Sequence, residues 1–483
     1  MRRHPRACFL SIAASLLLAA APAWDPDLWL ADLKQLRAAI DERYPNRDWL
    51  TGQREVSLDR WFDRTADAIR QARNDADARR ALDALITRFN DGHVLLRWPE
   101  PTEVAAAGSA RAAAPPPSTV AGFCAARGYD AGQVTAGTAS TLPGYRAVDG
   151  NGPFGAGIVN AAGMTVGVVR IGVFSPRGYP SLCERAVADA GVAFDEPCDA
   201  TCDDRVLTQA YALMTHGLMR TVERLEQARA QVLLIDLTRN GGGSEWAEAA
   251  ARIVSPVSLR SAPIGVMRGE AWVRRWRDLA TRLRNEGETA PRSDRAMLAD
   301  LAKRADATAE GLKPCTGPTC SRLAQAGFAS GLLAELPAGR LKGRAWGPEV
   351  FSAAQYPYRD SVWKGPVIVL VDSGTWSAAE QFTALLRDNH AAVVMGTRTG
   401  GAGCGHLHGK GPITLMHSKA VLELPNCARF RKDGSNEVGG VVPDVSTGVR
   451  WNDGRTYAGR LTAARLPEAV AQAKAMLARQ APR

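Results

Sequence analysis

The stretch that decides the fold runs from Gly365 to Gly396 and reads GPVIVLVDSGTWSAAEQFTALLRDNHAAVVMG. Its run of valine and isoleucine at 366–371 predicts a buried strand, and the turn-forming residues at 372–375 end it. A helix then begins at Ser377, and a second apolar strand follows at 391–395. A serine at such a strand-to-helix corner has its hydroxyl lifted clear of the sheet, beside the first free amides of the helix. Ser377 is therefore a candidate nucleophile, and the amide of Ala378 is a candidate oxyanion donor.

The same residues also fit a purely structural role. Ser377 and Glu380 form the S-x-x-E pattern of a capping box, in which the serine satisfies helix amides and catalyses nothing. Capping serines far outnumber nucleophiles, so this stretch alone does not decide between the two roles. The rest of the chain has to do so.

Length and composition predict a globular protein of two or three domains. The chain has 483 residues, of which 46% are hydrophobic and 23% are charged, so it can bury a full core. Its formal net charge of +10 is spread along the sequence and does not argue for nucleic acid as a partner.

Residues 1–23 have the pattern of a signal peptide. Three arginines precede an apolar run, and Ala21-Pro22-Ala23 forms an A-x-A cleavage site. Removing this leader lowers the formal charge from +10 to +7. No later stretch is long enough to span a bilayer, so we expect a soluble protein exported to the periplasm or secreted.

The cysteines suit an oxidising compartment. Nine are present, and eight remain once Cys8 leaves with the leader. Close spacing favours three pairs and leaves a fourth by remainder, although eight cysteines allow 105 connectivities. Zinc is the rival explanation of the close spacings, but no histidine lies near them at finger spacing. The predicted pairs are Cys198 with Cys202, Cys315 with Cys320, Cys404 with Cys427, and Cys124 with Cys183.

Periodicity and composition suggest five regions. After the leader, 24–98 form a helical domain, 99–163 a linker with a small irregular or β region, and 261–362 an arginine-rich insertion that is a possible lid. The α/β core comprises 164–260 and 363–483, and a helix at 467–477 closes the chain.

A glycine loop follows a strand expected at 232–237. It contains Gly241 and Gly242, and Ser244 caps the helix that comes next. Neither the phosphate-loop motif nor the dinucleotide motif G-x-G-x-x-G is met, so a nucleotide site is not expected. The bare amides of Gly241 or Gly242 suit an oxyanion hole instead.

Four motifs in order, DLTRNGGGS, GTWSAAEQF, GTRTGGAG and NEVGGVVPD, resemble the core of the carboxy-terminal processing peptidase family. This family of serine peptidases also includes the tricorn core and the interphotoreceptor retinoid-binding proteins. The resemblance covers about 166–445, apart from the insertion, and the NDGHV segment before it is similar too. It implies an α/β core of the crotonase/ClpP type with βα repeats, and it favours Ser377 as the nucleophile.

The resemblance also indicates a subtype. The tail-specific branch has a lysine base about 25 residues after the serine, where this chain has Ala402, and no PDZ segment is evident. The tricorn-like branch uses a histidine and a glutamate, which His93 and Glu437 match. It carries a serine beside the histidine, where this chain has Gly92.

These residues predict acyl-enzyme chemistry. His93 would take the proton of Ser377, and Glu437, chosen over Asp433 and Asp444, would orient the imidazole. Without the motif, His93 would be a polar strand end and Glu437 a solvated turn acid. The H-x-H pair of His406 and His408 is a rival metal site or base. The proposed chemistry needs no cofactor and no metal.

Three functions fit this reading. The first is an exported serine peptidase acting on a peptide or an unfolded protein tail. The second is a non-catalytic ligand-binding module on the same fold, since a fold does not fix a function. The third is a serine hydrolase of non-peptide esters, although the common G-x-S-x-G elbow is absent at Ser377.

Overall fold

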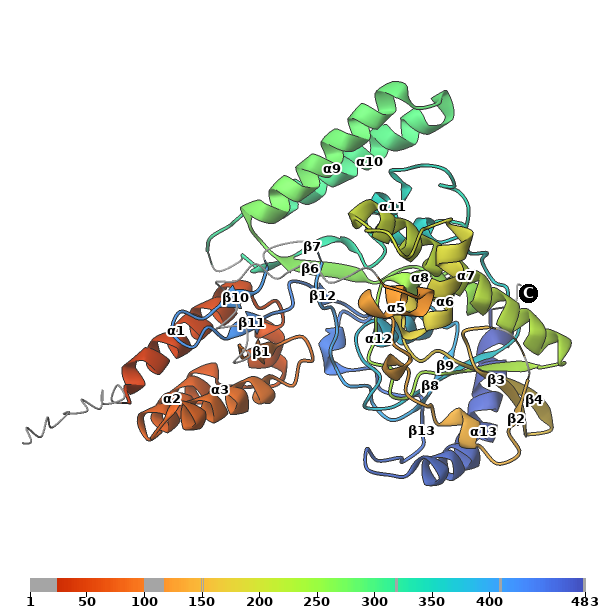
Figure 1. Cartoon of the computed structure of the whole chain (residues 1–483), viewed down its shortest axis with the longest axis horizontal. Coiled ribbons are helices and arrows are strands. Elements are labelled where there is room, and N and C mark those ends of the chain that lie inside the picture. Colours follow the sequence, from red (N-terminus) through yellow and green to blue (C-terminus); the bar gives the residue numbers. More distant parts are fainter. Residues whose placement is uncertain are drawn as a thin grey trace, which may run out of the picture.

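A seven-stranded mixed sheet forms the centre of the larger lobe (Figure 1). The computed structural model describes residues 24–99, 117–148, 150, 152–317, 320–407 and 411–480, so the predicted signal peptide, most of the predicted linker and His408 lie outside the described residues. The strand order is β13-β9-β8-β5-β4-β3-β2, with β4 to β13 parallel and β2 and β3 antiparallel. The strands are β2 (Arg146–Ala147), β3 (Ala156–Ala161), β4 (Met164–Arg170), β5 (Val232–Asp236), β8 (Val367–Val371), β9 (Val393–Gly396) and β13 (Val445–Ser446).

Successive residues of these strands face opposite layers of helices. In β5, Leu233 and Ile235 belong to the core shared with α6, α7, α8 and α12, whereas Val232 and Leu234 pack with α13. Burial on both faces explains why the central strands are continuous apolar runs, and it confirms the predicted α/β class. These helices are α6 (Pro180–Asp189), α7 (Ala200–Gln227), α8 (Trp246–Val254), α12 (Ala378–Asp388) and α13 (Arg455–Ala478).

Short elements complete the larger lobe and connect its strands. They are α5 (Val120–Ala126), α11 (Gly347–Val350) and the 3-10 turns η2 (Ala131–Gln133), η3 (Ala139–Thr141), η4 (Pro176–Gly178), η5 (Ser352–Gln355) and η6 (Glu437–Gly439).

The last helix begins earlier than the sequence suggested. We expected it at 467–477, but α13 starts at Arg455 and contains Pro467 inside it. Leu466, Ala469 and Val470 are buried against the sheet. This packing maintains the helix although the proline removes one backbone hydrogen bond.

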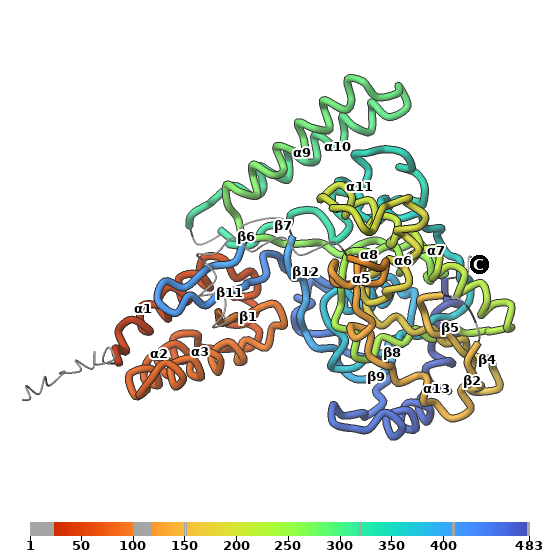
Figure 2. The backbone as a smooth tube through the Cα atoms, viewed as in Figure 1, coloured from red at the N-terminus to blue at the C-terminus, as the bar shows by residue number. Residues whose placement is uncertain are grey.

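The amino-terminal lobe is helical and has its own core. It contains α1 (Pro26–Arg43), the π-helical turn η1 (Trp49–Gln53), α2 (Leu58–Arg70) and α3 (Asp75–Phe89). A small sheet of order β1-β11-β10 joins it, from β1 (Leu95–Arg97), β10 (Ile413–Thr414) and β11 (Val421–Glu423). Figure 2 shows these late strands lying beside the first helices, and Leu415, Ala420 and Leu422 share the core of that lobe.

The segment at 261–362, which the sequence predicted to be an insertion, contains a helical hairpin that projects away from both lobes (Figure 1). It consists of α9 (Glu270–Thr289) and α10 (Arg292–Gly311), which bury Trp276, Leu283 and Leu298. At its base lies a sheet of order β12-β6-β7, from β6 (Pro263–Met267), β7 (Leu323–Phe328) and β12 (Ala428–Arg429).

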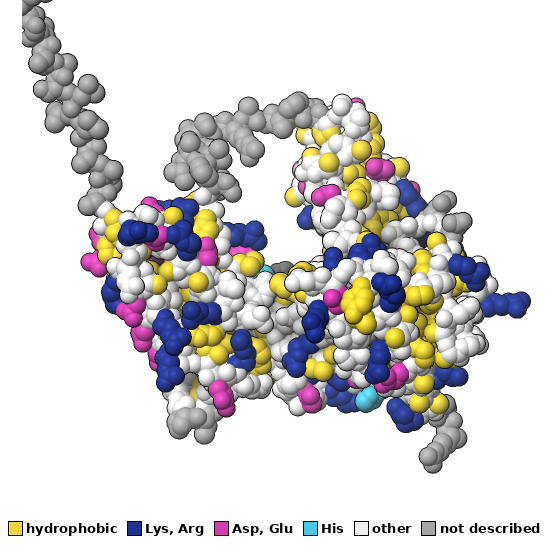
Figure 3. Space-filling model, turned by 90° about the horizontal axis from the view of Figure 1, so that it is seen from below, with side chains coloured by type: hydrophobic (Ala, Val, Ile, Leu, Met, Phe, Trp, Pro, Cys, Tyr) yellow, Lys and Arg dark blue, Asp and Glu magenta, His cyan; other side chains and the backbone are white. Residues whose placement is uncertain are grey.

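The four predicted cysteine pairs are all formed. Their Cα atoms lie 5.3 to 5.9 Å apart, within the range of a disulfide. Within the described residues, no helix is both long enough and apolar enough to cross a bilayer. Lysine and arginine side chains are scattered over the face of both lobes shown in Figure 3 rather than gathered in one patch.

Candidate active site

Ser377 occupies the predicted corner between β8 and α12. Its backbone has φ 54° and ψ −115°, a sparsely populated conformation that costs on the order of 1–3 kcal/mol for a residue with a side chain. The turn before it is fixed by Thr375, whose Oγ1 donates to the carbonyl of Leu237 at the end of β5. Such strain at a strand-to-helix corner is the geometry that presents a nucleophile.

The amides beside Ser377 can receive an oxyanion. Within the described residues, the N–H groups of Gly241 and Ala378 have no hydrogen-bond acceptor. The N–H of Gly242 donates instead to Oδ1 of Asn240 at 2.8 Å, so that amide is already engaged. Of the two glycine donors expected from sequence, the structure leaves that of Gly241 free.

Gly242 has a steric role at the same point. Its φ is +107°, and a Cβ there would lie 2.8 Å from Cβ of Ser377 and 3.0 Å from the amide nitrogen of Ala378. Only glycine allows the loop to approach the serine this closely. The glycine loop and the start of α12 therefore meet at Ser377.

Glu380 is fully buried behind Ser377 and accepts five hydrogen bonds. Its Oε2 accepts the N–H of Ser377 at 3.0 Å, as the capping box predicted. Burial and the nearby charge of Glu437 raise the pKa of Glu380 to about 7, while its donors lower it. One carboxylate thus joins the first turn of α12 to the loop at 399–403. The other four donors are Thr399 Oγ1 and the N–H groups of Gly401, Ala402 and Gly403.

The loop at 399–403 positions His93. Nδ1 of His93 lies 2.8 Å from the carbonyl oxygen of Ala402. A carbonyl only accepts, so Nδ1 carries the proton and Nε2 is left as the basic nitrogen. Burial is the main cause that lowers the pKa of His93, and the positive charge of Arg429 lowers it further. The neutral imidazole required of a general base is therefore favoured at neutral pH.

The chain neighbours of His93 and Ser377 pack against each other. A Cβ at Gly92 would lie 2.7 Å from two ring carbons of Trp376, and a Cβ at Gly400 would also collide with that indole. The indole therefore takes the space in which a side chain at position 92 would lie. This explains why the chain has Gly92 where the tricorn-like pattern has a serine.

Glu437 is buried in an ion pair. Its Oε2 accepts a hydrogen bond from Nε of Arg429 at 2.7 Å, and its Oε1 pairs with Nη2 of the same guanidinium. Among the described residues, neither Ser377 nor Glu437 hydrogen-bonds to His93. Nη2 of Arg429 also donates to the carbonyls of Gly403 and Ser377, at 3.2 and 3.4 Å. Glu437 is therefore linked to the other two candidates through Arg429.

Asp91 is a carboxylate beside His93 that the sequence did not single out. It is buried, accepts the N–H of His93 at 2.9 Å, and has Oδ1 3.9 Å from Nδ1 of the same residue. Its Oδ2 accepts from Tyr44 and Asn46, and burial raises the pKa of Asp91 to about 6. Its position in the Asn-Asp-Gly turn next to His93 was the sequence feature that could have indicated this role.

The rival histidine site is only partly described. The ring of His406 lies edge-on to that of His93, with centroids 5.9 Å apart, and burial lowers the pKa of His406. The described residues contain no group of three or more histidine, cysteine or acidic side chains that could hold a metal ion.

A family model for peptidase family S41 matches residues 206–447, which is just over half of the chain. The chain belongs to peptidase family S41. The match contains the glycine loop, Ser377 and Glu437, and the S41 assignment makes the protein a serine peptidase with a peptide or protein substrate. It confirms the predicted resemblance.

Two solved structures support the fold of this S41 peptidase. Mature CPAF aligns with a TM-score of 0.61 at 14% identity, covering 95% of this chain and 99% of that chain. Mature CPAF complexed with lactacystin gives a TM-score of 0.61 at 16% identity, covering 94% and 99%. A comparison with curated protein sequences finds no match. At these identities the likeness concerns the fold alone.

Proposed function

We propose that the protein is an exported serine peptidase that cleaves peptides or unfolded protein tails through an acyl-enzyme on Ser377. The observation that carries this is the convergence of a strained serine, two free amides and a loop that fixes the tautomer of His93. The predicted leader and the four disulfides support export.

In the first half of the reaction, Nε2 of His93 takes the proton of Ser377 as Oγ attacks the scissile carbonyl. The carbonyl oxygen becomes an oxyanion and accepts the N–H groups of Ala378 and Gly241. The imidazolium then gives its proton to the leaving amine, the C–N bond breaks, and an ester to Ser377 remains. Loss of one oxyanion donor typically costs on the order of 100- to 1000-fold in rate.

In the second half, His93 takes a proton from water as the water oxygen attacks the ester. The acid product leaves, and the proton returns to Ser377. Glu437 and Asp91 are the two carboxylates available to stabilise the imidazolium. Glu437 matches the family motif, and Asp91 is close to Nδ1, so we assign Glu437 to the Ser/His/Glu set and Asp91 to positioning of His93.

A cleft between the amino-terminal lobe and the base of the helical hairpin suits an extended substrate. A cavity of about 540 Å³ lies between the end of α1 and the start of α9, with Trp272 and Asn426 among its lining residues. The N–H of Asn426 donates to the carbonyl of Gly405, and a Cβ at Gly405 would lie 2.6 Å from Nε2 of His93. A chain in this cleft would therefore lie against Asn426, which is hydrogen-bonded to the segment that borders His93.

Labelling with a fluorophosphonate tests the proposal. We expect a covalent adduct on the wild type, none on Ser377→Ala, and labelling at least 100-fold slower on His93→Ala. Ser373→Ala is the matched control, because that serine lies in the same turn and its hydrogen bond with Trp376 uses only its backbone carbonyl. A folded wild type that forms no adduct would identify a binding module instead. Cleavage of an ester together with failure on unfolded protein would identify the non-peptide hydrolase.

A further inference from the structure

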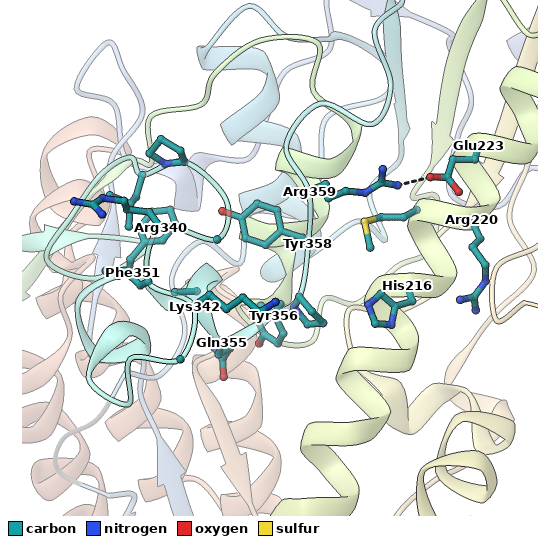
Figure 4. Close-up of a pocket in the computed structure, with 18 residues that line it drawn as sticks. His216, Arg220, Glu223, Arg340, Lys342, Phe351, Gln355, Tyr356, Tyr358 and Arg359 are labelled. Atoms are coloured by element: carbon teal, nitrogen blue, oxygen red, sulfur yellow. Dashed lines mark hydrogen bonds and ion pairs between the residues drawn. The ribbon is translucent and has the colours of Figure 1, made fainter. Parts of the chain in front are cut away.

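A second cavity lies away from Ser377, between α7 and the segment at 336–359 (Figure 4). Its volume is about 650 Å³, within the range of small-molecule sites. Its lining includes none of the residues assigned above to catalysis or to the oxyanion hole. The chemistry described so far therefore leaves this cavity without a role.

The rim of the cavity is strongly basic. Four cations line it against a single carboxylate, that of Glu223, which pairs with Arg359. The side chains of the other three cations form no ion pair with any described residue. An excess of positive charge around a cavity raises the local concentration of anions. The three cations without an ion pair are Arg220, Arg340 and Lys342.

The floor of the cavity is apolar and aromatic. Phe351, Tyr356 and Tyr358 are all buried there, and Figure 4 shows the ring of His216 on α7 facing Tyr356. Such a floor can stack on a planar ligand, and guanidinium groups at the edges of a cavity can bind carboxylate or phosphate oxygens.

One polar group of the floor has no partner. The hydroxyl of Tyr358 is buried and makes no hydrogen bond to any described residue, and the side chain as a whole is only 7% exposed. Figure 4 shows this hydroxyl on the side of the ring that faces the loop of Arg340. An unsatisfied buried hydroxyl typically costs about 1–3 kcal/mol, which a ligand oxygen accepting its proton would offset.

We propose that this cavity binds a small organic anion with two or more negative charges and a planar apolar body. Arg220, Arg340 and Lys342 pair with its carboxylate or phosphate oxygens, and the hydroxyl of Tyr358 donates a hydrogen bond to it. Tyr356 and Phe351 contact its apolar part. This inference does not depend on the peptidase chemistry.

Calorimetric titration of the full chain tests the site with three probes of similar size. Phthalate carries two carboxylates, phenyl phosphate carries one phosphate, and benzyl alcohol is uncharged. We expect saturable binding of at least one anion, weakening as salt is raised, and none of benzyl alcohol. The stronger of the two anions identifies the preferred headgroup.

Variants locate the binding on the protein. Arg220→Gln and Arg340→Gln should each weaken anion binding at least fivefold, and Tyr358→Phe should weaken it at least twofold. Arg64→Gln removes an exposed arginine of α2 and should change nothing. Labelling of Ser377 at the wild-type rate serves as the folding control. The proposal is overturned if neither anion binds saturably, if benzyl alcohol binds as tightly, or if Arg220→Gln and Arg340→Gln bind like the wild type.

Discussion

Glu380 of α12 and Glu437 of η6 are equally buried, but the negative charge of each is stabilised in a different way. Glu380 and Glu437 have no exposed surface. Glu437 is neutralised by the guanidinium of Arg429. Glu380 forms no ion pair within the described part of the chain, and five neutral donors surround it.

The difference shows which parts of the site each kind of contact holds in place. Four of the donors to Glu380 are backbone amides, so its carboxylate sets the path of the chain from Ser377 to the loop that holds His93. The ion pair mainly joins side chains: beside its bonds to the carbonyls of Ser377 and Gly403, Arg429 donates from Nη1 to Gln381, whose Nε2 donates to Glu248. We therefore expect loss of the Glu437–Arg429 pair to have the larger effect on stability, and loss of Glu380 to have the larger effect on the position of the loop that holds His93.

Breaking the ion pair should have the largest effect on stability. Arg429→Met leaves Glu437 buried without a cation, and removing one partner of such a pair typically costs about 3–5 kcal/mol. Urea unfolding followed by fluorescence measures this loss. The double variant Arg429→Met/Glu437→Leu should recover at least half of it, because no buried charge of the pair then remains.

The matched control is a more exposed pair. Arg387 and Asp444 form an ion pair with side chains 34% and 23% exposed, so Arg387→Met should cost no more than about 1 kcal/mol. Equal losses at positions 387 and 429 would refute the dominance of the buried pair.

Neutralising Glu380 should have the largest effect on reactivity among these variants. Glu380→Gln keeps the size of the side chain but turns one acceptor into a donor that faces backbone N–H groups. The loop at 399–403 would then shift, and a shift of about 1 Å at a catalytic group can cost on the order of 100-fold. Fluorophosphonate labelling of Ser377 should slow by that factor. A labelling rate like that of the wild type would show that Glu380 only stabilises the fold.

The pH dependence of labelling distinguishes the two glutamates further. Only the neutral imidazole of His93 is a base, so the rate should be constant at high pH and fall as the pH drops through the pKa of His93. Burial, with a contribution from Arg429, lowers that pKa below its usual value of 6.5, so the midpoint should lie below pH 6.5. The Arg429→Met/Glu437→Leu variant loses the positive charge that lowers this pKa, and the carboxylate lost with it is hydrogen-bonded to Arg429 rather than to His93, so the midpoint of its remaining rate should move upward. Protonation of Glu380, whose pKa burial raises to about 7, should add a separate fall in rate near pH 7, because the loop that holds His93 then loses its carboxylate acceptor. A single fall centred above pH 6.5 that the Arg429→Met/Glu437→Leu variant leaves unmoved would contradict the assignment of His93 as the buried base.

Much of the site around Ser377 could be predicted because its signals are local. The strand, turn and helix at 366–388 lie within one continuous stretch, and the capping contact of Glu380 is only three residues from Ser377. Close spacing likewise identified three disulfides, and the fourth followed by remainder.

The parts that sequence reasoning missed depend on distant contacts. Arg429 lies in the segment Cys-Ala-Arg-Phe-Arg-Lys, which looks like a basic surface turn, yet it is buried because Glu437 and the carbonyls of Ser377 and Gly403 surround it. No periodicity in that segment signals those partners. Similarly, β10 and β11 join a core formed by helices more than 300 residues earlier.

The smallest expected effect tests whether the donors around Glu380 act separately. Thr399 donates from Oγ1 to Glu380 at 2.6 Å, and the same oxygen accepts the N–H of Val441 at 2.7 Å. Thr399→Val removes this link while leaving the four backbone donors in place, so unfolding should become easier by about 1–2 kcal/mol and labelling should slow less than tenfold. Thr399→Ser keeps the hydroxyl and should behave like the wild type in both measurements. Thr399→Val could instead slow labelling as much as Glu380→Gln does. That result would show that the five donors act cooperatively. The backbone amides alone would then not hold the loop at 399–403, and with it His93, in place.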